Sequence, residues 1–511
     1  MSRRFALVSL VIPFFAMAVE YHVADVVELT NRVAKAANGD ILYLAEGTYE
    51  LEGTAGAYTS GHLNLGNGCT LRIRAEEGCP RERVVLKSNG RRHIYANKGF
   101  LELKGVTLDG GGSSGGFNFA NLDAGFLLTN CVFRNCKATG SGGAIGTYSS
   151  GVTPPNKSRK AFHCAFLDNR SDGSGGAYNG VLAEFSYCVF TNNSAGGSAG
   201  AVYGGGRYSN CEFVNNVSKY TGSAAAGGGG AYSGPAVDTA FEDCLFVSNR
   251  VTSTSAYGGA IFWPGTGTIV CAFTNCTFAA QQAPSYAVIG YGKNATAGVF
   301  VECTFDGNQA TNGPFGASGE FNRCRWTRNR MAVSAHAHMF AGNYKNCLFE
   351  ANTNSATGNQ SSLVYDGKIR NCTFIDNYLR NGERSIANTG VTLWNCVLAN
   401  RTRDLYQQQL PRMTNCVWTS QSATNAAFEA ALALVSAGGR LIANNRLKFS
   451  PEASYVPLYG SPLRDNGISD EDYLAEVGPQ DLAGAERVAF GGIDIGCYEC
   501  QKSPGLVLIL R

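Results

Sequence analysis

The sequence has little charge and few residues that favour helices. Only 16% of its 511 residues are charged, and the formal net charge is +3. Such a small net charge gives only a weak electrostatic field, which argues against nucleic acid as the partner. The chain also lacks the long acidic run that would indicate a disordered tail. Lysine and glutamate are sparse, whereas glycine is abundant with 64 residues. This composition argues against helical bundles and favours turn-rich β structure.

Long apolar runs are also missing beyond the N-terminus. The first residues, MSRRFALVSLVIPFFAMA, combine Arg3 and Arg4 with an apolar stretch and a small-x-small cleavage site that ends at Ala18. This pattern predicts a signal peptide over residues 1–18, and the alternative is a buried N-terminal strand. No later stretch approaches the 18 apolar residues of a membrane span. The sequence therefore predicts an exported, soluble chain from about Val19.

Cysteine and histidine spacings typical of zinc sites are absent, although the chain has 18 cysteines. Twelve of them fall at one repeated position, 20 to 33 residues from one to the next. These are Cys131, Cys164, Cys188, Cys211, Cys244, Cys276, Cys303, Cys324, Cys347, Cys372, Cys396 and Cys416. A minimum near 20 with irregular excess indicates a fixed structural turn that carries loops of variable length.

A longer pattern surrounds each cysteine: apolar, x, Asn, Cys, x, Phe, x, x, Asn, as in IRNCTFIDN at 369–377. The cysteine and the aromatic residue two positions later point to one face of a strand. The apolar residue three positions before the cysteine is out of phase, so two short strands joined by a tight bend are needed to bury all three. The residue before the cysteine occupies that bend, and it is of a type that tolerates the left-handed conformation. The bend residues are Asn130, Asn210, Asp243, Asn275, Asn346, Asn371, Asn395 and Asn415.

Glycine-rich segments such as GGAIG at 142 and GGAYN at 175 predict a third short strand in each repeat. Three strands in about 22 residues indicate an all-β parallel β-helix of roughly 14 coils, whose stacked coils share one core. The cysteines then form an internal ladder, the phenylalanines a second ladder and the asparagines a ladder at the bends. Two states of the ladder cysteines stay open: buried, unreactive thiols or cross-coil disulfides, for which parallel neighbours have poor geometry. Outside the ladder, Cys69 and Cys79 could close a loop, and Cys497 and Cys500 could pair with each other or with other cysteines.

The two ends lack the repeat. Residues 24–37 carry apolar residues at helical spacing and predict a helix that caps the first coil, and AAFEAALALV at 426–435 predicts a second helix. We expect an N-terminal cap over 19–40, the β-helix over 41–424, and a C-terminal helix with a closing segment over 425–511.

Three stretches resemble known families. The repeated GGA[I/Y] and FxxN motifs, as in Gly175 to Tyr178 and Phe166 to Asn169, resemble repeats of chlamydial polymorphic outer membrane proteins. GDILYLAEGTYEL resembles the entry to pectate-lyase-like right-handed β-helices. The C-terminal part resembles the signature of bacterial choice-of-anchor Q proteins. The matching residues are Ser461, Pro462, Asp465, Gly467, Asp481, Gly484, Arg487, Asp494, Ile495, Gly496, Tyr498 and Glu499. The resemblance implies a right-handed β-helix that is secreted or held at a bacterial outer surface.

The catalytic motifs implied by these lyase-like folds are missing. The Asn-Thr-Asp, Asp-Asp, Gly-His-Gly and Arg-Ile-Lys elements of polygalacturonases do not occur. Two acids, Asp168 and Asp376, sit within FxxN and are expected to serve turns. No cofactor is indicated, and a calcium ion stays open.

Two sets of residues are candidates for ligand contacts. His336 and His338 lie two residues apart and would face the same way on a strand, as a metal or substrate contact or as ordinary partly buried histidines. Tyr178, Tyr203 and Tyr232 follow glycine-rich segments and would stack along one face. That row is either internal or an exposed stripe for sugar rings.

Three functions fit these observations. The first is a rigid exported rod that binds a polysaccharide or a cell-surface partner through one face and through loops such as 146–160, 217–228 and 250–257. The second is a polysaccharide lyase or glycoside hydrolase with an unusual site. The third is a structural component of a coat or matrix. Fold alone does not decide among them.

Overall fold

A computed structural model gives the structure of the chain. It describes residues 18–52, 61–65, 68–119, 123–147, 158–180, 182–222, 227–234, 238–254, 256–263, 271–291, 298–311, 319–332, 339–356, 362–380, 385–407, 409–419, 426–438, 440–441, 446–450, 455–458, 460–489 and 492–501.

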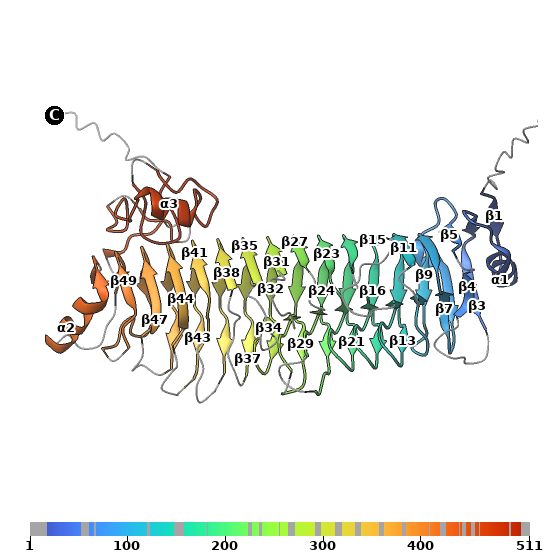
Figure 1. Ribbon diagram of the computed structural model, residues 1–511, viewed down its shortest axis with the longest axis horizontal. Coiled ribbons are helices and arrows are strands. Elements are labelled where there is room, and N and C mark those ends of the chain that lie inside the picture. Colours follow the sequence, from blue (N-terminus) through green and yellow to red (C-terminus); the bar gives the residue numbers. More distant parts are fainter. Residues whose placement is uncertain are drawn as a thin grey trace, which may run out of the picture.

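The chain winds as a right-handed parallel β-helix, in which each strand pairs in parallel with the equivalent strand of the next coil (Figure 1). The stacked strands form four long sheets, which we call A to D. A central coil runs from sheet A through B and D to C, and then returns to A. Sheet A contains β1 (Glu20–Val23), β2 (Ile41–Leu44), β5 (Thr70–Ala75), β8 (Gly99–Lys104), β11 (Ala124–Thr129), β15 (Arg159–Phe162), β19 (Ala183–Ser186), β23 (Gly206–Ser209), β27 (Thr239–Glu242), β31 (Cys271–Thr274), β35 (Gly298–Val301), β38 (Gly319–Asn322), β41 (Asn343–Lys345), β44 (Val364–Arg370), β47 (Ala387–Trp394), β49 (Arg412–Thr414) and β51 (Ser436–Ala437).

From β2 onward, each strand of sheet A is followed by a strand of sheet B. It contains β3 (Gly47–Leu51), β6 (Val84–Ser88), β9 (Thr107–Asp109), β12 (Val132–Arg134), β16 (Ala165–Leu167), β20 (Val189–Thr191), β24 (Glu212–Val214), β28 (Leu245–Val247), β32 (Thr277–Ala279), β36 (Thr304–Asp306), β39 (Arg325–Thr327), β42 (Leu348–Glu350), β45 (Thr373–Ile375), β48 (Val397–Ala399), β50 (Val417–Trp418) and β52 (Arg440–Leu441).

Sheets D and C complete the coil. Sheet D contains β13 (Lys137–Ala138), β17 (Arg170–Ser171), β21 (Ser194–Ala195), β25 (Val217–Ser218), β29 (Arg250–Val251), β33 (Gln282–Ala283), β37 (Gln309–Ala310), β40 (Arg330–Met331), β43 (Thr353–Asn354) and β46 (Tyr378–Leu379). Sheet C contains β4 (Gly61–Leu65), β7 (Arg92–Ala96), β10 (Phe117–Phe119), β14 (Ile145–Thr147), β18 (Tyr178–Asn179), β22 (Val202–Tyr203), β26 (Tyr232–Ser233), β30 (Ile261–Trp263) and β34 (Ile289–Tyr291).

The predicted fold class is confirmed, with two differences. Each central coil has four strands, not the three predicted from the sequence, because the two residues after the FxxN asparagine form the short strands of sheet D. Sheet A has 17 described strands, more than the expected 14 or so, because β1 to β8 and β51 lie in coils without the repeated cysteine.

The predicted bend between sheets A and B is confirmed. The residue before each ladder cysteine has a φ angle between 48° and 58°, the left-handed region that asparagine tolerates best. We call these twelve residues the bend row. They are Asn130, His163, Tyr187, Asn210, Asp243, Asn275, Glu302, Arg323, Asn346, Asn371, Asn395 and Asn415.

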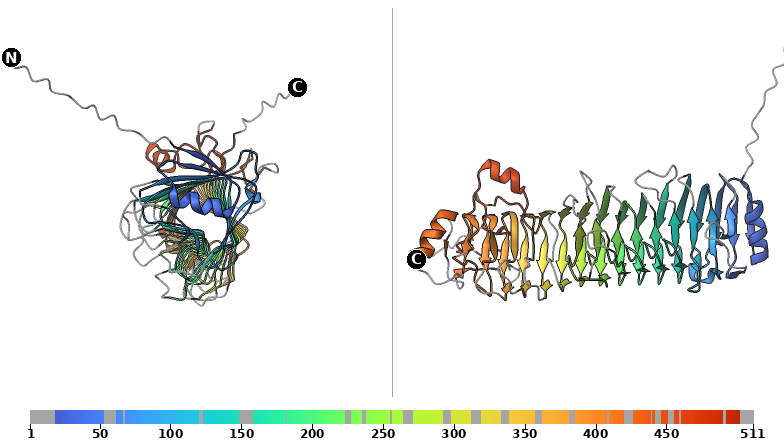
Figure 2. Two further views of the ribbon diagram at one scale, coloured as in Figure 1. Left: turned by 90° about the vertical axis from the view of Figure 1, so that its right-hand side faces the viewer. Right: turned by 60° about the horizontal axis from the view of Figure 1, so that its bottom comes forward.

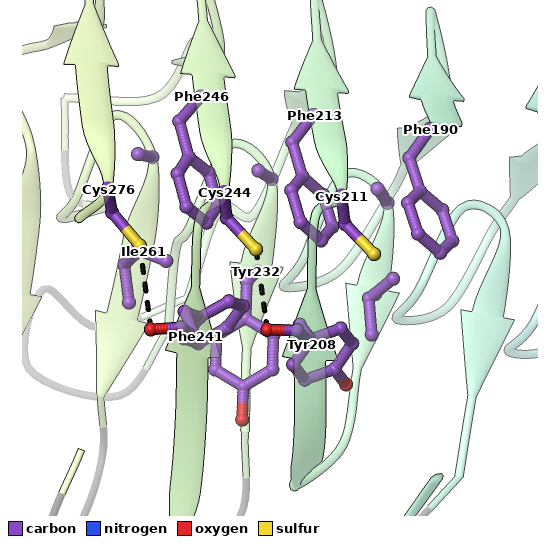
Figure 3. Packing of buried hydrophobic residues seen from close by; sticks show 14 of the residues in the cluster. Phe190, Tyr208, Cys211, Phe213, Tyr232, Phe241, Cys244, Phe246, Ile261 and Cys276 are labelled. Carbon is purple, nitrogen blue, oxygen red and sulfur yellow. Dashed lines mark hydrogen bonds between the residues drawn. The ribbon is translucent and has the colours of Figure 1, made fainter. Parts of the chain in front are cut away.

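Aromatic side chains fill the core in stacks that follow the axis of the β-helix (Figure 3). In sheet B, successive rings from Phe133 to Phe305 have centroids 4.7–5.1 Å apart and planes within 8° of parallel. This spacing matches the roughly 4.8 Å between neighbouring strands. One phenylalanine per repeat therefore gives a continuous stacked column.

The ladder cysteines are buried beside these rings. The thiol of Cys244 donates to the carbonyl of Tyr208 at 3.4 Å, and Cys276 bonds Phe241 in the same way at 3.5 Å (Figure 3). All eighteen cysteines lie in the described ranges and all are free thiols, including the four proposed as the pairs Cys69–Cys79 and Cys497–Cys500. Neither of the two proposed disulfides is therefore part of this structure, and the ladder cysteines are free thiols.

A second row of asparagines, those that end the FxxN motif, is buried after the sheet B strand. The Oδ1 atom of Asn193 accepts from the backbone and side-chain nitrogens of Asn169 at 3.1 and 3.0 Å. Its Nδ2 donates to the carbonyl of Phe166 and to Oδ1 of Asn216. Buried amides satisfied in this way hold neighbouring coils in register. The ladder consists of Asn169, Asn193, Asn216, Asn249, Gln281, Asn308, Asn329, Asn352, Asn377 and Asn400.

Both predicted helices are present. Helix α1 (Val26–Lys35) is capped by Asp25, buries Leu29 and Val33, and lies across the open end of the first coils (Figure 2). Helix α2 (Ala426–Val435) lies at the opposite end (Figure 1). Among the described residues, no helix is both long and apolar enough for a membrane crossing. The η1 turn (Arg81–Arg83) and helix α3 (Glu471–Val477) are additional short elements.

The described residues between 446 and 501, which we call the closing segment, fold back over the side of the last coils rather than extending the β-helix (Figure 1). Leu463 and Ile495 pack on the outer face of sheet B against Val397 and Val417. Polar contacts fix the segment to five residues of the bend row, the first of which, Arg323, donates to the side-chain oxygen of Gln480. Asn346 donates to the carbonyl of Val477, Tyr473 donates to Asn371, Ile468 donates to Asn395, and Asn415 donates to the carbonyl of Asn466.

Candidate functional site

The bend row is exposed over the N-terminal half of the β-helix. From Asn130 to Glu302 every residue of the row is exposed, whereas Asn346, Asn371 and Asn395 are buried beneath the closing segment. The exposed part has the same backbone and the same strand spacing of roughly 4.8 Å. It therefore offers side chains at regular intervals along the rod, and the described part of the closing segment does not cover them.

An aromatic pair occupies this exposed part. The rings of His163 and Tyr187 stack with centroids 4.9 Å apart and planes at 15°. Tyr187 is 54% exposed, and the half-buried Phe162 precedes His163 on the same edge. Exposed flat rings with polar rims are suited to contact the apolar faces of sugar rings.

A cavity of about 370 Å³ lies next to the aromatic pair along the row. It is lined by the loop Glu76–Cys79, by Asn130 and by two cations of sheet A, Arg74 and Lys104. The guanidinium group of Arg81 connects the cavity with the aromatic pair, because it donates to Oδ1 of Asn130 at 3.1 Å and to the carbonyl of His163 at 2.9 Å.

The register of the sheet A strands determines where the two cations of the cavity lie. Tyr43, Arg74 and Lys104 occupy equivalent positions in β2, β5 and β8, so they form one outward row on sheet A. Arg74 is held by the carboxylate of Glu102 at 2.5 Å. Lys104 is exposed and forms no ion pair with any described residue, so its ammonium group is available to a ligand. We call this set, from Tyr43 through the cavity to Tyr187, the N-terminal bend surface.

The structure separates the three tyrosines that the sequence analysis places in one row. Tyr178 and Tyr232 are fully buried, and their rings make edge contacts with Phe185 and Phe241 inside the core. Burial raises the pKa of both hydroxyl groups above their ordinary value. The interpretation as an exposed stripe is therefore wrong for these two residues, because their side chains point away from any external ligand.

Tyr203 lies on the other face of sheet C. It pairs with Asn179 and Ser233, whereas Tyr178 pairs with Val202. The glycine-rich segments align on their buried alanines, which moves Tyr203 one position out of phase with the other tyrosines. A shift of one residue reverses the face to which a strand side chain points.

His336 and His338 lie outside the described residues, as does most of the loop 146–160. Asp168 and Asp376 have φ angles of 55° at the second bend, in agreement with the turn role expected for them.

Sequence reasoning missed His163, Tyr187 and Lys104. The first two carry a signal, because they break the bend pattern by replacing asparagine with a ring in consecutive coils. Lys104 and Arg74 lie in early coils that lack the repeat, so their register with one another is visible only in the structure.

No protein-family model and no curated protein matches the chain. Among solved structures, the chain is similar to a mannuronic-acid-specific polysaccharide family 6 lyase from human gut microbiota, with 11% identity, coverage of 83% of this chain and 91% of that one, and a TM-score of 0.27. The A-module of the Azotobacter vinelandii mannuronan C-5 epimerase AlgE4 gives 9% identity, 82% and 94% coverage, and a TM-score of 0.27. Pectate lyase Pel9A shares 12% identity over 92% of this chain and 90% of its own, with a TM-score of 0.19. At these values the similarity carries no information on activity or substrate.

Proposed function

We propose that the chain is an exported β-helical rod that binds a polysaccharide along the N-terminal bend surface. The observation that carries this proposal is the stacked, exposed pair of His163 and Tyr187 beside a cavity with a free cation, Lys104. Sugar rings would lie against the aromatic pair, and their hydroxyl or carboxylate groups would reach Asn130, Arg81 and Lys104. The resemblance of its repeats and its C-terminal part to polymorphic outer membrane proteins and choice-of-anchor Q proteins supports export and a place at a bacterial surface.

The C-terminal half of the bend row supports the binding role. There, asparagine side chains of the row bond the peptide groups and side chains of the closing segment, as Asn395 does with both the N–H and the carbonyl of Ile468. Asn210 occupies the equivalent position in the exposed half, and its side chain makes no hydrogen bond to a described residue. A free amide of this kind has donors and acceptors available for sugar hydroxyl groups.

The experiment is retention on immobilised polysaccharides, with alginate and polygalacturonate as polyuronates and with neutral glucans. Each incubation is also read for unsaturated and reducing-end products. The test variant combines His163→Asn with Tyr187→Asn, because asparagine keeps the left-handed bend while removing the rings. The matched control is Tyr378→Asn, which removes a tyrosine that is 42% exposed on sheet D.

We expect wild type and control to be retained by at least one polysaccharide, and the double variant to bind about tenfold more weakly, since two aromatic contacts are lost. Equal retention of the double variant and wild type would show that the polysaccharide does not bind at the N-terminal bend surface. Product formation would instead show that the chain is a lyase or hydrolase.

A further inference from the structure

Three carboxylates meet inside the closing segment. Asp465, Asp494 and Glu499 each offer an oxygen within 4.8 Å of the other two. Asp494 is 0% exposed and Glu499 is 2% exposed, whereas Asp465 lies at the surface. Carboxylates are seldom buried together without a positive partner.

Hydrogen bonds satisfy all but one of the buried carboxylate oxygens. Asp494 accepts from the backbone nitrogens of Asp465 at 2.7 Å and Cys500 at 2.8 Å. Oε2 of Glu499 accepts from the nitrogen of Asp494 at 3.0 Å. Oε1 of Glu499 is buried and has no hydrogen-bond partner among the described residues. Such an orphaned oxygen in a native core calls for a proton, a water or an ion.

The charges around the cluster do not balance. Arg487 lies 3.7 Å from Oε2 of Glu499, and Arg464 lies 3.2 Å from Asp465. A fourth carboxylate, the buried Asp481, accepts from the nitrogen of Glu499 at 2.9 Å. Carboxylates therefore outnumber guanidinium groups, and Arg487 also donates to two backbone carbonyls and to a bend asparagine.

Space for further ligands lies beside the cluster. A cavity of about 250 Å³ is lined by Asp481, Glu499 and Cys500 together with apolar residues such as Val456 and Leu458. A volume of this size admits several water molecules.

We propose that Asp465, Asp494 and Glu499 bind a divalent cation, of which Ca²⁺ is the best match, and that this ion fastens the closing segment. Calcium prefers carboxylate, carbonyl and water oxygens at about 2.3–2.6 Å, so opposite ligands lie about 4.6–5.2 Å apart, as these carboxylates allow. The ion would join Asp465 to residues 494–499, and both stretches contact the bend row: the carbonyl of Asn466 accepts from Asn415, and the nitrogen of Gly496 donates to the carbonyl of Asn395.

The alternative is a proton on Glu499. Burial away from water raises the pKa of this carboxyl to about 9, and the neighbouring Asp494 carboxylate acts in the same direction. A neutral carboxyl would need no cation. Replacement of Glu499 by glutamine separates the two states, because glutamine has the shape of the neutral acid and cannot replace an anionic ligand.

The test uses the full chain after removal of metals with EGTA. Calorimetric titration with CaCl₂ and thermal unfolding with and without Ca²⁺ are measured for wild type, Glu499→Gln and Asp465→Asn, with MgCl₂ for comparison. The control is Asp472→Asn, an exposed acid of α3 outside the cluster.

We expect one ion per chain, a rise of several degrees in the unfolding temperature with Ca²⁺, and an unchanged response of the control. Both cluster variants should bind at least tenfold more weakly. Asp465→Asn changes an exposed side chain, so it decides the question if Glu499→Gln does not fold. The proposal is overturned if wild type binds no Ca²⁺, or if Asp465→Asn binds it as wild type does. A Glu499→Gln variant as stable as wild type with no response to Ca²⁺ in either would assign a proton to Glu499.

Discussion

The two halves of the bend row share one backbone and differ in what covers them. In the C-terminal half, Asn346, Asn371 and Asn395 are buried and bonded to the closing segment. In the N-terminal half, the equivalent residues are exposed, and two of them are the stacked rings of His163 and Tyr187. The comparison shows that the same left-handed bends hold the closing segment by hydrogen bonds in one half and stay exposed in the other. The chain uses one half for its own closing segment and leaves the other half available.

We expect the largest loss of stability from substitutions in the buried asparagine ladder, which test whether the interior is the same in both halves. The side chains of Asn193 and Asn352 each make four ladder hydrogen bonds, the first in a coil of the exposed half and the second in a coil of the covered half. Either asparagine changed to alanine leaves buried partners unsatisfied and should lower the free energy of unfolding by roughly 3 kcal/mol. Urea denaturation measures both.

The matched control for this ladder test is Asn192→Gly. Asn192 is exposed at a φ of 57°, next to Asn193, and its change should stay within about 0.5 kcal/mol. Unequal losses for Asn193→Ala and Asn352→Ala would show that the halves differ inside as well as outside.

A smaller effect tests the covered half against the exposed half directly. Asn395→Gly removes the hydrogen bonds to both polar groups of Ile468, so it should lower stability by roughly 2 kcal/mol and speed hydrogen exchange of that amide. Asn210→Gly makes the same change where no partner covers the side chain, and should leave exchange and stability unchanged. Glycine tolerates the bend in both variants, so the backbone contribution cancels. Equal responses would contradict a binding role for the covered bend asparagines.

The mildest test compares the chemical reactivity of two thiols, one near each half of the bend row. Cys79 is half-buried and lines the cavity of the N-terminal bend surface, while Cys497 is buried within the closing segment. Burial raises the pKa of Cys497 to about 12, which leaves roughly 1,000-fold less thiolate than an ordinary thiol at pH 8. A thiol reagent followed by mass spectrometry should therefore modify Cys79 in the native protein and Cys497 only after unfolding. Early modification of Cys497 would mean that the closing segment opens readily.

The repeat made most of the fold predictable. The out-of-phase spacing of the apolar residue and the cysteine required the bend that Asn371 and its equivalents provide, and helical spacing located both α1 and α2. Sheet D was not predicted, because a strand of two residues is too short to show an alternation of apolar and polar residues. The buried role of Asn193 and its equivalents was also unforeseen, since the sequence alone does not tell a bend asparagine from an inward one.

The candidate site was far less predictable. The prediction that the tyrosines share one face was wrong, because one additional residue before Tyr203 turns its side chain to the opposite face from that of Tyr178. The docking of residues 466–477 on bends about 50–130 positions earlier depends on contacts that no local pattern encodes. Asp465, Asp494 and Glu499 lie in the stretch that resembles the choice-of-anchor Q signature, but their convergence could be seen only in the fold.

The most direct test of the central claim is hydroxyl-radical footprinting of the chain with and without a saturating polysaccharide from the retention panel. The account predicts protection of Phe162, His163 and Tyr187 and unchanged oxidation of Tyr378 on sheet D. Protection of Tyr378, with unchanged oxidation of His163 and Tyr187, would contradict it and would place the binding surface on another face of the β-helix.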